Sequence, residues 1–514
     1  MSDTAHPPVG ADVVIVGAGF SRAVSNCFGL TEELGQAAIE KAGLPSDMRP
    51  GREERFESWL SRLAEDQPYR PAAESLEARA QFLRLATSVA EVVAEWEARA
   101  FASTPPTWLE DLLSVLHVRR GIIISFNYDH VIECGVEGHC LMDRAAEVRV
   151  RAADVLARLP LCATYLEEEE RTYPVPWPGN LLGQDPKLMP SGWLPETFRL
   201  VKLHGSLSWY WDPGDHLGIT LQRWRVPGRF GDYVPADEAE RRRSLPSREP
   251  FVVPPTATKS PYLTNLVTRE LWKTAREALS VASRVVLLGY SLPGEDQVVQ
   301  GLLAETLRHR NVKVVVANYT PEPVVERLRA LDVVQHADQV CCFSGAESIA
   351  DFSTWYRDEQ ARITAIRLSE ELTRLFESHA DTPEGNPPLD GQILVRWGSC
   401  ENMSCDTGAS RIGHVGGLDL NWYQQSGNAD GVVEIHIAGM GSANSVQQDA
   451  VQRLAELLRQ RTRPPTLVAV TPDGHSFPVI DYQFRSSIPP STAAFIDPSH
   501  HLHLFPAGHP RPGS

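Results

Sequence analysis

The stretch at residues 122–129 reads Ile-Ile-Ile-Ser-Phe-Asn-Tyr-Asp, and it leads from an apolar run directly into polar side chains. The run is short, continuous and β-branched, which is typical of a strand buried on both faces of a parallel sheet. Such sheets bind ligands at the carboxyl ends of their strands. Asn127 can donate and accept hydrogen bonds there without ionising, so it can hold a ligand hydroxyl or a water. An Asx turn that closes the strand is an equally good interpretation of this stretch alone.

Four more apolar runs of the same kind occur in the first two thirds of the chain, at residues 12–16, 198–203, 284–288 and 312–317. Helical patterns lie between them, for example at 131–136 and 262–282. Strands that alternate with helices predict an α/β fold with a doubly wound, Rossmann-type parallel sheet. Asn318 closes the run that begins at residue 312.

The first run is followed at once by Gly17-Ala18-Gly19-Phe20-Ser21-Arg22. Glycines let the backbone approach a pyrophosphate, and the N–H groups of a following helix supply partial positive charge. Only a Gly-x-Gly core is present, without a third glycine at the usual dinucleotide spacing, so a plain tight turn explains it equally well. Arg22 is a candidate phosphate clamp or a surface charge.

His204 follows the run at 198–203 and is itself followed by Gly205. A lone histidine is more often a packed residue than a catalyst, but this position at a strand end favours a functional role. Histidine is also the side chain that exchanges protons near neutral pH. We therefore expect His204 and Asn127 to meet at one edge of the sheet.

A length of 514 residues predicts more than one domain. We assign residues 12–352 to the α/β domain, with a helical insertion at 30–117 and an irregular, proline-rich insertion at 141–197. Phe56, Trp59 and Trp96 are expected in the core of the helical insertion. Residues 353–389 are predicted to form a helix and linker.

Residues 390–514 are predicted to form a separate small α+β domain with strands at 392–397, 432–438, 466–470 and 477–484, and a helix at 446–460. No catalytic constellation is evident there. His500, His501 and His503 could bind a metal, but a flexible tail is the more common context for such a cluster.

Composition excludes several classes of function. A formal net charge of −17 argues against nucleic acid as the principal partner. The eight cysteines form no Cys-x-x-Cys pair, so we expect no metal site. No run reaches the ~18 apolar residues of a membrane helix, and the amino terminus has no signal-peptide pattern. A cytoplasmic protein that does not bind membranes is expected.

Four motifs taken together, at residues 16–21, 126–129, 203–206 and 289–293 with Asp296, resemble the bacterial sirtuin-like domain. The resemblance covers about residues 12–352, and the C-terminal domain is outside it. Family members bind NAD in a Rossmann-type fold, and many hydrolyse NAD in anti-phage defence. The resemblance implies NAD as substrate and catalytic roles for Asn127, His204 and Asp129. It implies binding of NAD by Gly17, Ala18, Gly19, Phe20, Ser21, Arg22, Gly289, Ser291 and Asn318. Asp129 could polarise the catalytic network, although capping the next helix is its more common role.

The resemblance predicts an NAD glycohydrolase, an anti-phage effector that acts by depleting NAD. A homo-oligomer is expected, and the C-terminal domain would sense a phage-derived trigger or contact a partner protein. Two alternatives stay open, an NAD-dependent protein deacylase and a non-catalytic module that binds NAD or ADP-ribose to control assembly. The missing Cys-x-x-Cys zinc ribbon argues against acyl-lysine recognition.

Overall fold

The structure of the chain is a computed structural model, in which the chain divides into two compact units. The first unit comprises residues 1–106, 120–138 and 151–352, and the second comprises 107–119, 139–150 and 353–514. The described residues are 11–45, 49–51, 54–139, 141–143, 148–156, 173–174, 196–212, 221–223, 228–233, 243, 245, 247–256, 266–379, 392–398, 409–415, 418–424, 431–438, 445–459, 466–470 and 476–478.

The first unit is built on a six-stranded sheet in which all neighbouring strands are parallel. In spatial order the strands are β12 (Val340–Ser344), β11 (Lys313–Asn318), β10 (Arg284–Leu288), β1 (Asp12–Val16), β2 (Ile122–Ser125) and β6 (Arg199–Lys202). Numbered along the chain among themselves, they run 6-5-4-1-2-3, which is the strand order of a Rossmann fold. The predicted α/β class and doubly wound sheet are confirmed.

The central strands are apolar because both faces of this sheet are covered. Every residue of β1 and of β2 is buried. β12, at the edge, was not predicted from the sequence because its middle residues, Cys341 and Cys342, are exposed and its apolar run is interrupted. Asn318, which was predicted at the end of its strand, is the last residue of β11.

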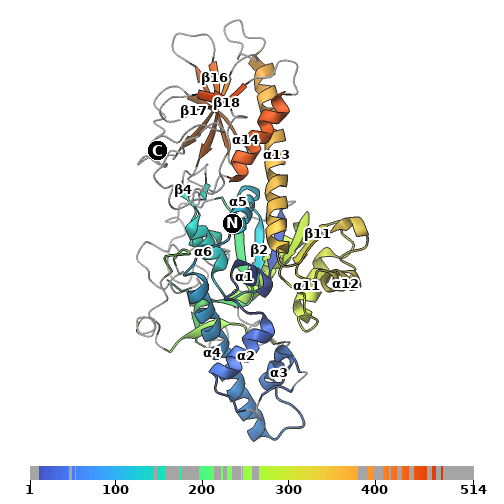
Figure 1. The fold of residues 1–514 in the computed structure, drawn as a ribbon. Helices are drawn as coiled ribbons and strands as arrows, with labels where there is room; N and C mark the ends of the chain where they lie inside the picture. The colour runs from blue at the N-terminus through green and yellow to red at the C-terminus, as the bar shows by residue number, and fades with distance from the viewer. Residues whose placement is uncertain are drawn as a thin grey trace. The chain divides into compact units, whose positions relative to one another are not determined.

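Helices flank the sheet on both sides (Figure 1). They are α1 (Ala18–Val24), α6 (Val131–Gly138), α10 (Leu266–Val281), α11 (Gln297–Leu307) and α12 (Glu322–Ala330). The short helix η3 (Ala337–Gln339) precedes β12, and α13 (Ser348–His379) carries the chain into the second unit. The predicted alternation of strands and helices therefore holds along this unit.

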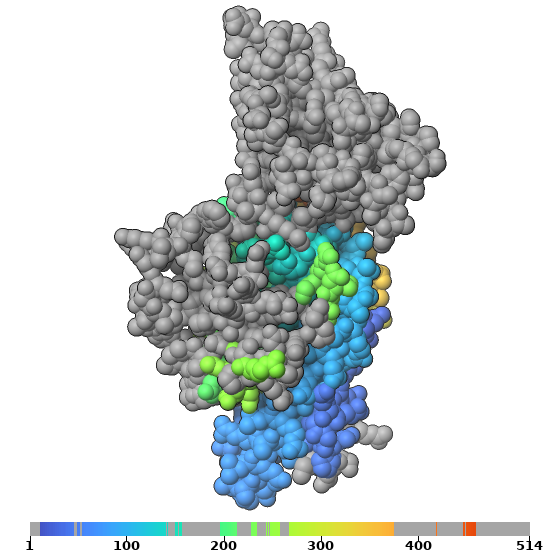
Figure 2. Space-filling model, turned by 90° about the vertical axis from the view of Figure 1, so that its left-hand side faces the viewer, coloured from blue at the N-terminus to red at the C-terminus, as the bar shows by residue number. Residues whose placement is uncertain are grey.

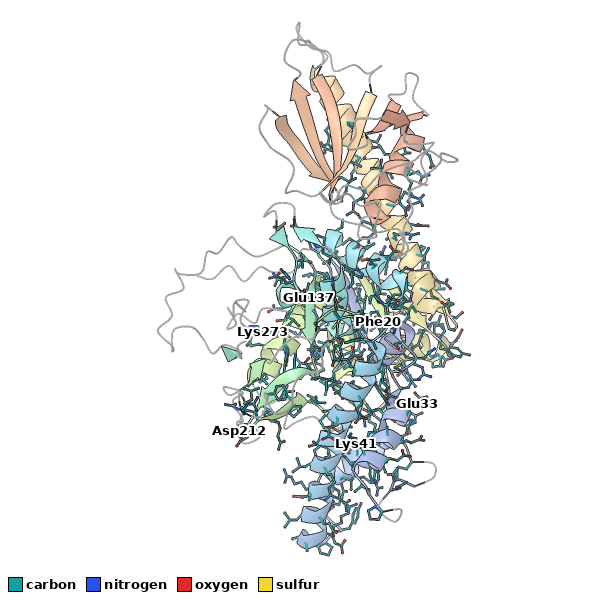
Figure 3. All side chains as sticks on the ribbon, turned by 60° about the vertical axis from the view of Figure 1, so that its left-hand side comes forward. Phe20, Glu33, Lys41, Glu137, Asp212 and Lys273 are labelled. Atoms are coloured by element: carbon teal, nitrogen blue, oxygen red, sulfur yellow. The ribbon has the colours of Figure 1, made fainter. Side chains whose placement is uncertain are left out.

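The helical insertion of the first unit consists of α2 (Thr31–Lys41), α3 (Phe56–Ala64) and α4 (Ala72–Ala100), which lie side by side in Figure 1. Phe56 and Trp59 are buried in its core, as predicted, whereas Trp96 is only half-buried. Lys41 of α2, which is labelled in Figure 3, forms ion pairs with Glu91 and Glu95 of α4. The core of the insertion extends to Tyr128 and Val252, next to the sheet's carboxyl edge.

A second, antiparallel sheet follows β6. Its strands, in spatial order, are β5 (Tyr173–Pro174), β8 (Gln222–Arg223), β7 (Gly205–Trp211) and β9 (Glu249–Val252). The aromatic residues of β7 are buried, and Trp211 packs edge-on against Phe251. α7 (Ala152–Val155) is the only other described element between α6 and β5 in the first unit. Most of the predicted irregular insertion at 141–197 lies outside the described residues.

The second unit contains a mixed six-stranded sheet. In spatial order its strands are β14 (Ala409–Val415), β15 (Leu418–Gln424), β16 (Gly431–Ala438), β13 (Gln392–Gly398), β17 (Thr466–Val470) and β18 (Ser476–Pro478). With α14 (Ser445–Arg459) it forms the α+β arrangement predicted for residues 390–514, although β14 and β15 were missed. Residues 380–389 of the predicted helix and linker, and the histidines at 500, 501 and 503, lie outside the described residues.

Two further pieces belong to the second unit. They are α5 (Thr107–Arg119), which the sequence assigned to the helical insertion, and the hairpin of β3 (Met142–Asp143) and β4 (Val148–Arg149). Arg357 of α13 binds Asp111 of α5 at 2.8 Å and Asp449 of α14 at 3.1 Å. In the described part of both units, no helix is long and apolar enough to cross a bilayer.

We expect Gly19→Ala to destabilise the first unit, because an added Cβ would lie 2.8 Å from the Cα and carbonyl oxygen of Gly289, and backbone atoms cannot move aside cheaply. Overpacking of this kind costs about 1 to 3 kcal/mol. Gly301→Ala is the matched control, since its Cβ would meet nothing within 4 Å in the middle of α11. That variant should be stabilised by up to about 1 kcal/mol. Urea unfolding measures both, and equal stabilities would contradict the packing argument.

Candidate functional site

A cavity of about 480 Å³ opens at the carboxyl ends of β1, β2, β10 and β11. Its volume lies within the range of small-molecule sites. Ten of the predicted site residues line it: Gly17, Ala18, Gly19, Ser21, Asn127, Asp129, His204, Gly289, Ser291 and Asn318. Phe20 and Arg22 do not. Side chains that are far apart in the sequence thus meet at one edge, because parallel strands all end there.

The cavity lies where the order of the strands reverses. β1 and β10 are neighbours in the sheet, and their following turns pack against each other. The N–H of Gly19 donates to the carbonyl oxygen of Gly289 at 2.9 Å, and Gly289 has a left-handed backbone with φ of 58°. A Cβ on Gly289 would lie 2.2 Å from the nitrogen of Phe20. The two glycines are therefore required by the close approach of two turns.

The N–H groups of the glycine turn already have partners within the protein. Gly17 donates to Leu288 at 3.3 Å, and Phe20 donates to Gly17 at 2.9 Å. Together with the bond from Gly19, these contacts satisfy three of the donors that the sequence offered to a pyrophosphate. α1 itself has only seven residues. The role of this turn in phosphate binding stays a prediction, whereas its role in packing is shown.

Asn127 is fixed by two hydrogen bonds from its amide nitrogen. Nδ2 donates to the carbonyl oxygen of Gly17 at 2.9 Å and to Oγ of Ser21 at 2.9 Å. A carbonyl oxygen can only accept, so the amide cannot be turned the other way round. Both donors of Asn127 are occupied, and Oδ1 is left as the acceptor of a half-buried side chain that lines the cavity. Asn127 is suited to accept a hydrogen bond from a hydroxyl or a water.

Asp129 connects Asn127 to the helix that follows. Oδ2 accepts a hydrogen bond from Oγ of Ser21 at 2.6 Å, and Oδ1 accepts one from the N–H of Val131, the first residue of α6, at 3.1 Å. Asp129 thus caps α6 and also orients Ser21. Burial raises the pKa of Asp129 above its ordinary value, against the opposing effect of the Lys202 charge.

His204 lines the cavity and is 6% exposed. Its ring centroid is 4.9 Å from that of Phe126, which in turn stacks on Tyr290 at 4.7 Å. The carbonyl oxygen of His204 accepts a hydrogen bond from the N–H of Val253, next to β9. The imidazole is therefore held by aromatic neighbours on one side, while it borders the cavity.

Behind the cavity is a buried lysine that the sequence analysis did not identify. Lys202, the last residue of β6, is 1% exposed. Its ammonium donates to the carbonyl oxygen of Asp129 at 2.6 Å, to Oε1 of Glu133 at 2.9 Å and to Oγ of Ser206 at 3.0 Å. A longer contact runs from the same ammonium to the carbonyl oxygen of Tyr128 at 3.4 Å, so all three N–H donors have acceptors. Lys202 therefore fixes the backbone that carries Asn127 and Asp129.

A second buried charge, Glu97 of α4, holds the same turn from the helical insertion. The Glu97 carboxylate accepts hydrogen bonds from the N–H of His130 at 2.8 Å and from the hydroxyl of Tyr233 at 3.0 Å, and it pairs with Nδ1 of His130 at 3.0 Å. Burial favours its neutral form, but these contacts outweigh burial and lower the pKa of Glu97. Burial and the neighbouring Glu97 raise the pKa of Tyr233, so its hydroxyl stays a donor.

The remaining predicted residues that line the cavity come from the ends of β10 and β11. Nδ2 of Asn318 donates to the carbonyl oxygen of Tyr290 at 3.4 Å, and its Oδ1 accepts from the N–H of Tyr319 at 2.8 Å. The Tyr290 hydroxyl donates to Asp296 at 3.1 Å, and burial raises the pKa of Tyr290. Asn318 therefore shapes the turn after β10.

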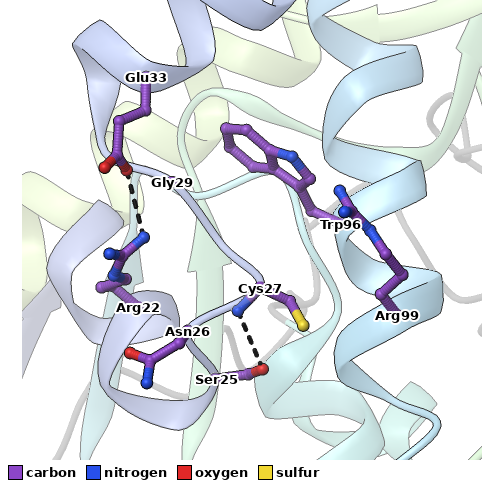
Figure 4. A pocket seen from close by; sticks show the side chains of 8 residues that line it. All are labelled: Arg22, Ser25, Asn26, Cys27, Gly29, Glu33, Trp96 and Arg99. Atoms are coloured by element: carbon purple, nitrogen blue, oxygen red, sulfur yellow. Dashed lines mark hydrogen bonds and ion pairs between the residues drawn. The ribbon is translucent and has the colours of Figure 1, made fainter.

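The two predicted residues outside the cavity have other surroundings. Phe20 is 1% exposed and packs in the interior (Figure 3). Arg22 donates to the carbonyl oxygen of Phe28 at 2.7 Å and pairs with Glu33 at 3.2 Å. It lines a second, more open cavity of about 460 Å³, shared with Trp96 and Arg99 (Figure 4). In this structure Arg22 holds the loop between α1 and α2.

Acidic side chains make up part of the main cavity's wall. Glu32, Glu33 and Glu57 come from the helical insertion, and Asp296 comes from the turn before α11. Trp96, expected in the core, forms part of the wall of both cavities. Among the described residues, no group of three or more His, Cys, Asp or Glu side chains is arranged to hold a metal ion.

Comparisons with known proteins do not assign a function to this chain. No protein-family model matches the sequence, and no curated protein matches it significantly.

Three residues that support the site were not identified from the sequence. Each of them is a charged residue at a position where the local pattern is apolar. Lys202 is a charge within an apolar strand, and Glu133 is acidic within the apolar start of α6. Glu97 is the one charge on the buried face of α4. A charge at a position where the pattern demands an apolar residue indicates a buried partner, but nothing in the sequence says which partner it is.

We expect Lys202→Met to cost about 3 to 5 kcal/mol of unfolding free energy, because it leaves the 2%-exposed Glu133 carboxylate buried without its partner. The double variant Lys202→Met, Glu133→Leu should recover much of that loss, since no unpaired charge is left. Chemical denaturation of the three proteins gives the comparison. A single variant as stable as the wild type would show that the pair is not coupled to folding.

The lowered pKa of Glu97 predicts how its contribution varies with pH. Its stabilisation should be complete above the ordinary pKa of about 4.5 and should disappear as the pH falls through the lowered folded-state value. Glu97→Gln should therefore cost about 3 kcal/mol at pH 7 and less at pH 4 and below. Glu95→Gln, at an exposed position on the same helix, should stay within about 0.5 kcal/mol of wild type. Urea unfolding across pH tests this, and a constant difference would contradict it.

Proposed function

We propose that the protein is an NAD⁺ glycohydrolase, which cleaves NAD⁺ to nicotinamide and ADP-ribose. The observation that carries this proposal is the fixed amide of Asn127, with its oxygen left as an acceptor in a cavity that His204 also lines. The cavity lies at the switch point of a Rossmann-ordered sheet, which is where such folds bind nucleotides. The likeness of the four strand-end motifs to the sirtuin-like domain supports the same substrate.

The departure of the leaving group requires little from the protein. Nicotinamide carries a positive charge on its glycosidic nitrogen and departs as a neutral molecule, so no general acid has to protonate it. The site has to stabilise an oxocarbenium-like transition state and position a water. Besides Asp129, four carboxyl groups in the wall, those of Glu32, Glu33, Glu57 and Asp296, provide negative potential that favours the cationic pyridinium and the positive charge of the transition state.

Asn127 and His204 divide the remaining work in this proposal. Oδ1 of Asn127 accepts a hydrogen bond from the water or from a ribose hydroxyl and so orients it. His204 accepts the proton that the water loses as it attacks the anomeric carbon. Ser21 holds the amide of Asn127, and Asp129 acts through Ser21 as a positioning residue in this scheme.

We further propose that the enzyme acts in anti-phage defence by depleting NAD, with the second unit as the regulatory part. This rests on the likeness of the motifs. Incubating the purified full-length protein with NAD⁺ and an acetylated peptide separates the possible activities. ADP-ribose as product supports the hydrolase, acetylated ADP-ribose would indicate a deacylase, and NAD binding without any product would indicate a binding module.

Asn127→Ala and His204→Ala should each reduce nicotinamide release by about 10²- to 10⁴-fold while the protein stays folded. Asn127→Asp should be as inactive as Asn127→Ala, because a carboxylate cannot donate to the Gly17 carbonyl oxygen and its shape alone is not sufficient. The double variant should lose less than the product of the two single losses, since both residues act on one water.

NAD affinity and thermal unfolding are measured alongside turnover for each variant. Asn26→Ala is the control, since this exposed residue lines only the second cavity. Near-wild-type turnover by His204→Ala would remove His204 from the mechanism and weaken the hydrolase proposal.

A further inference from the structure

Helix α4 has apolar residues on two opposite faces. Ala78, Phe82, Leu85 and Val89 are buried in the core of the helical insertion. A row on the other side is exposed and consists of Ala73, Leu76, Ala80 and Leu83, with the polar Thr87 at its end, and we call these five residues the α4 stripe. Leu76 is 70% exposed and Leu83 is 54% exposed. In Figure 2 the light-blue atoms of the α4 region lie at the surface near the bottom of the view.

The spacing of the α4 stripe is that of a helix-pairing seam. Its members follow one another at intervals of three, four, three and four residues, which is the heptad repeat of a coiled coil. The stripe extends over about 21 Å of helix at ~1.5 Å per residue. A single exposed leucine is ordinary on a protein surface, but a heptad row on a helix that already packs its other face is not.

The charges beside the stripe are self-complementary. Glu77 directly follows Leu76, and Arg84 directly follows Leu83, so both lie on the same flank of the seam. Both are exposed, and neither has an ion-pair partner among the residues that the structure describes. In an antiparallel pair of α4 helices related by a two-fold axis, Glu77 lies opposite the partner's Arg84, and the symmetry repeats this pair.

The same charges disfavour a parallel pair. In a parallel coiled coil, each residue on one flank faces the partner residue five positions further on. Arg79, on the other flank of the stripe, would then face the partner's Arg84, and two like charges would meet. In the antiparallel arrangement Arg79 faces the uncharged Ala86 of the partner subunit. Charge therefore selects the two-fold, antiparallel contact.

We propose that the α4 stripe is a homodimer contact, in which two copies of the chain pair their α4 helices antiparallel. The occupant is a second copy because the stripe and its flanking charges complement themselves under a two-fold axis. A contact of four helical turns is small compared with obligate interfaces, so the dimer should dissociate on dilution. The proposal is independent of the enzymatic activity.

Sedimentation velocity of the full-length protein over a range of concentrations tests the contact. The wild type should shift from monomer to dimer as the concentration rises. The double variant that carries both Leu76→Glu and Leu83→Glu should stay monomeric at every concentration. A dimer of this variant would place four carboxylates in the seam, two from each subunit. Ile366→Glu, at a 43%-exposed apolar position on α13, is the control and should dimerise like the wild type.

Charge reversal tests the geometry. Glu77→Arg alone and Arg84→Glu alone should each raise the dimer dissociation constant about tenfold, because both symmetric pairs become like-charged. The double reversal Glu77→Arg, Arg84→Glu restores opposite charges and should return the dissociation constant to within about threefold of wild type. Circular dichroism and thermal unfolding confirm that each variant is folded, which is expected because all these positions are exposed.

A wild type that stays monomeric at its highest soluble concentration would overturn the proposal. Dimerisation that survives the double glutamate variant would place the dimer contact elsewhere. Failure of the double charge reversal to restore what each single reversal loses would exclude the antiparallel pairing.

Discussion

The buried ammonium of Lys202 is the interaction on which the site depends. It lies at the end of β6 and joins the backbone of Asp129, the carboxylate of Glu133 in α6 and the hydroxyl of Ser206 in β7. Desolvating an ammonium is expensive, and the cost is offset only when every donor has an acceptor in good geometry. Because these acceptors come from separate segments, the turn that carries Asn127 cannot move unless one of these contacts is broken. Glu97 of α4 fixes the same turn from the helical insertion through His130.

The rigidity of this turn determines what Asn127 can do. Its amide nitrogen is tied to the turn after β1 and to Ser21, and Ser21 is tied to Asp129. The result is a fixed acceptor at the rim of a cavity, which is what positioning a nucleophile requires. α4 carries Glu97 near its carboxyl end and the exposed stripe nearer its amino end, so one helix both supports the site and presents a surface to solvent.

The glycines at positions 17, 19 and 289 illustrate how one motif can serve two structural roles. In the sequence they indicate a turn that a phosphate can approach, and in the structure they also let two turns pack backbone against backbone. Both roles need the absence of a side chain, so the residue type cannot distinguish them. The sequence left two roles for Arg22, a phosphate clamp and a surface charge. In the structure its guanidinium contacts Phe28 and Glu33 and does not line the main cavity.

The sequence by itself determined the central strands, their parallel pairing and the meeting of Asn127 and His204 at one edge. Those features follow from local hydrophobic runs and from the rule that parallel strands end together. Only the tertiary structure decided the partners of Lys202 and Glu97, the half-exposed position of Trp96 and the assignment of α5 to the second unit. These depend on contacts between segments distant in the chain, and a local pattern shows that a residue is buried but not what it is buried against.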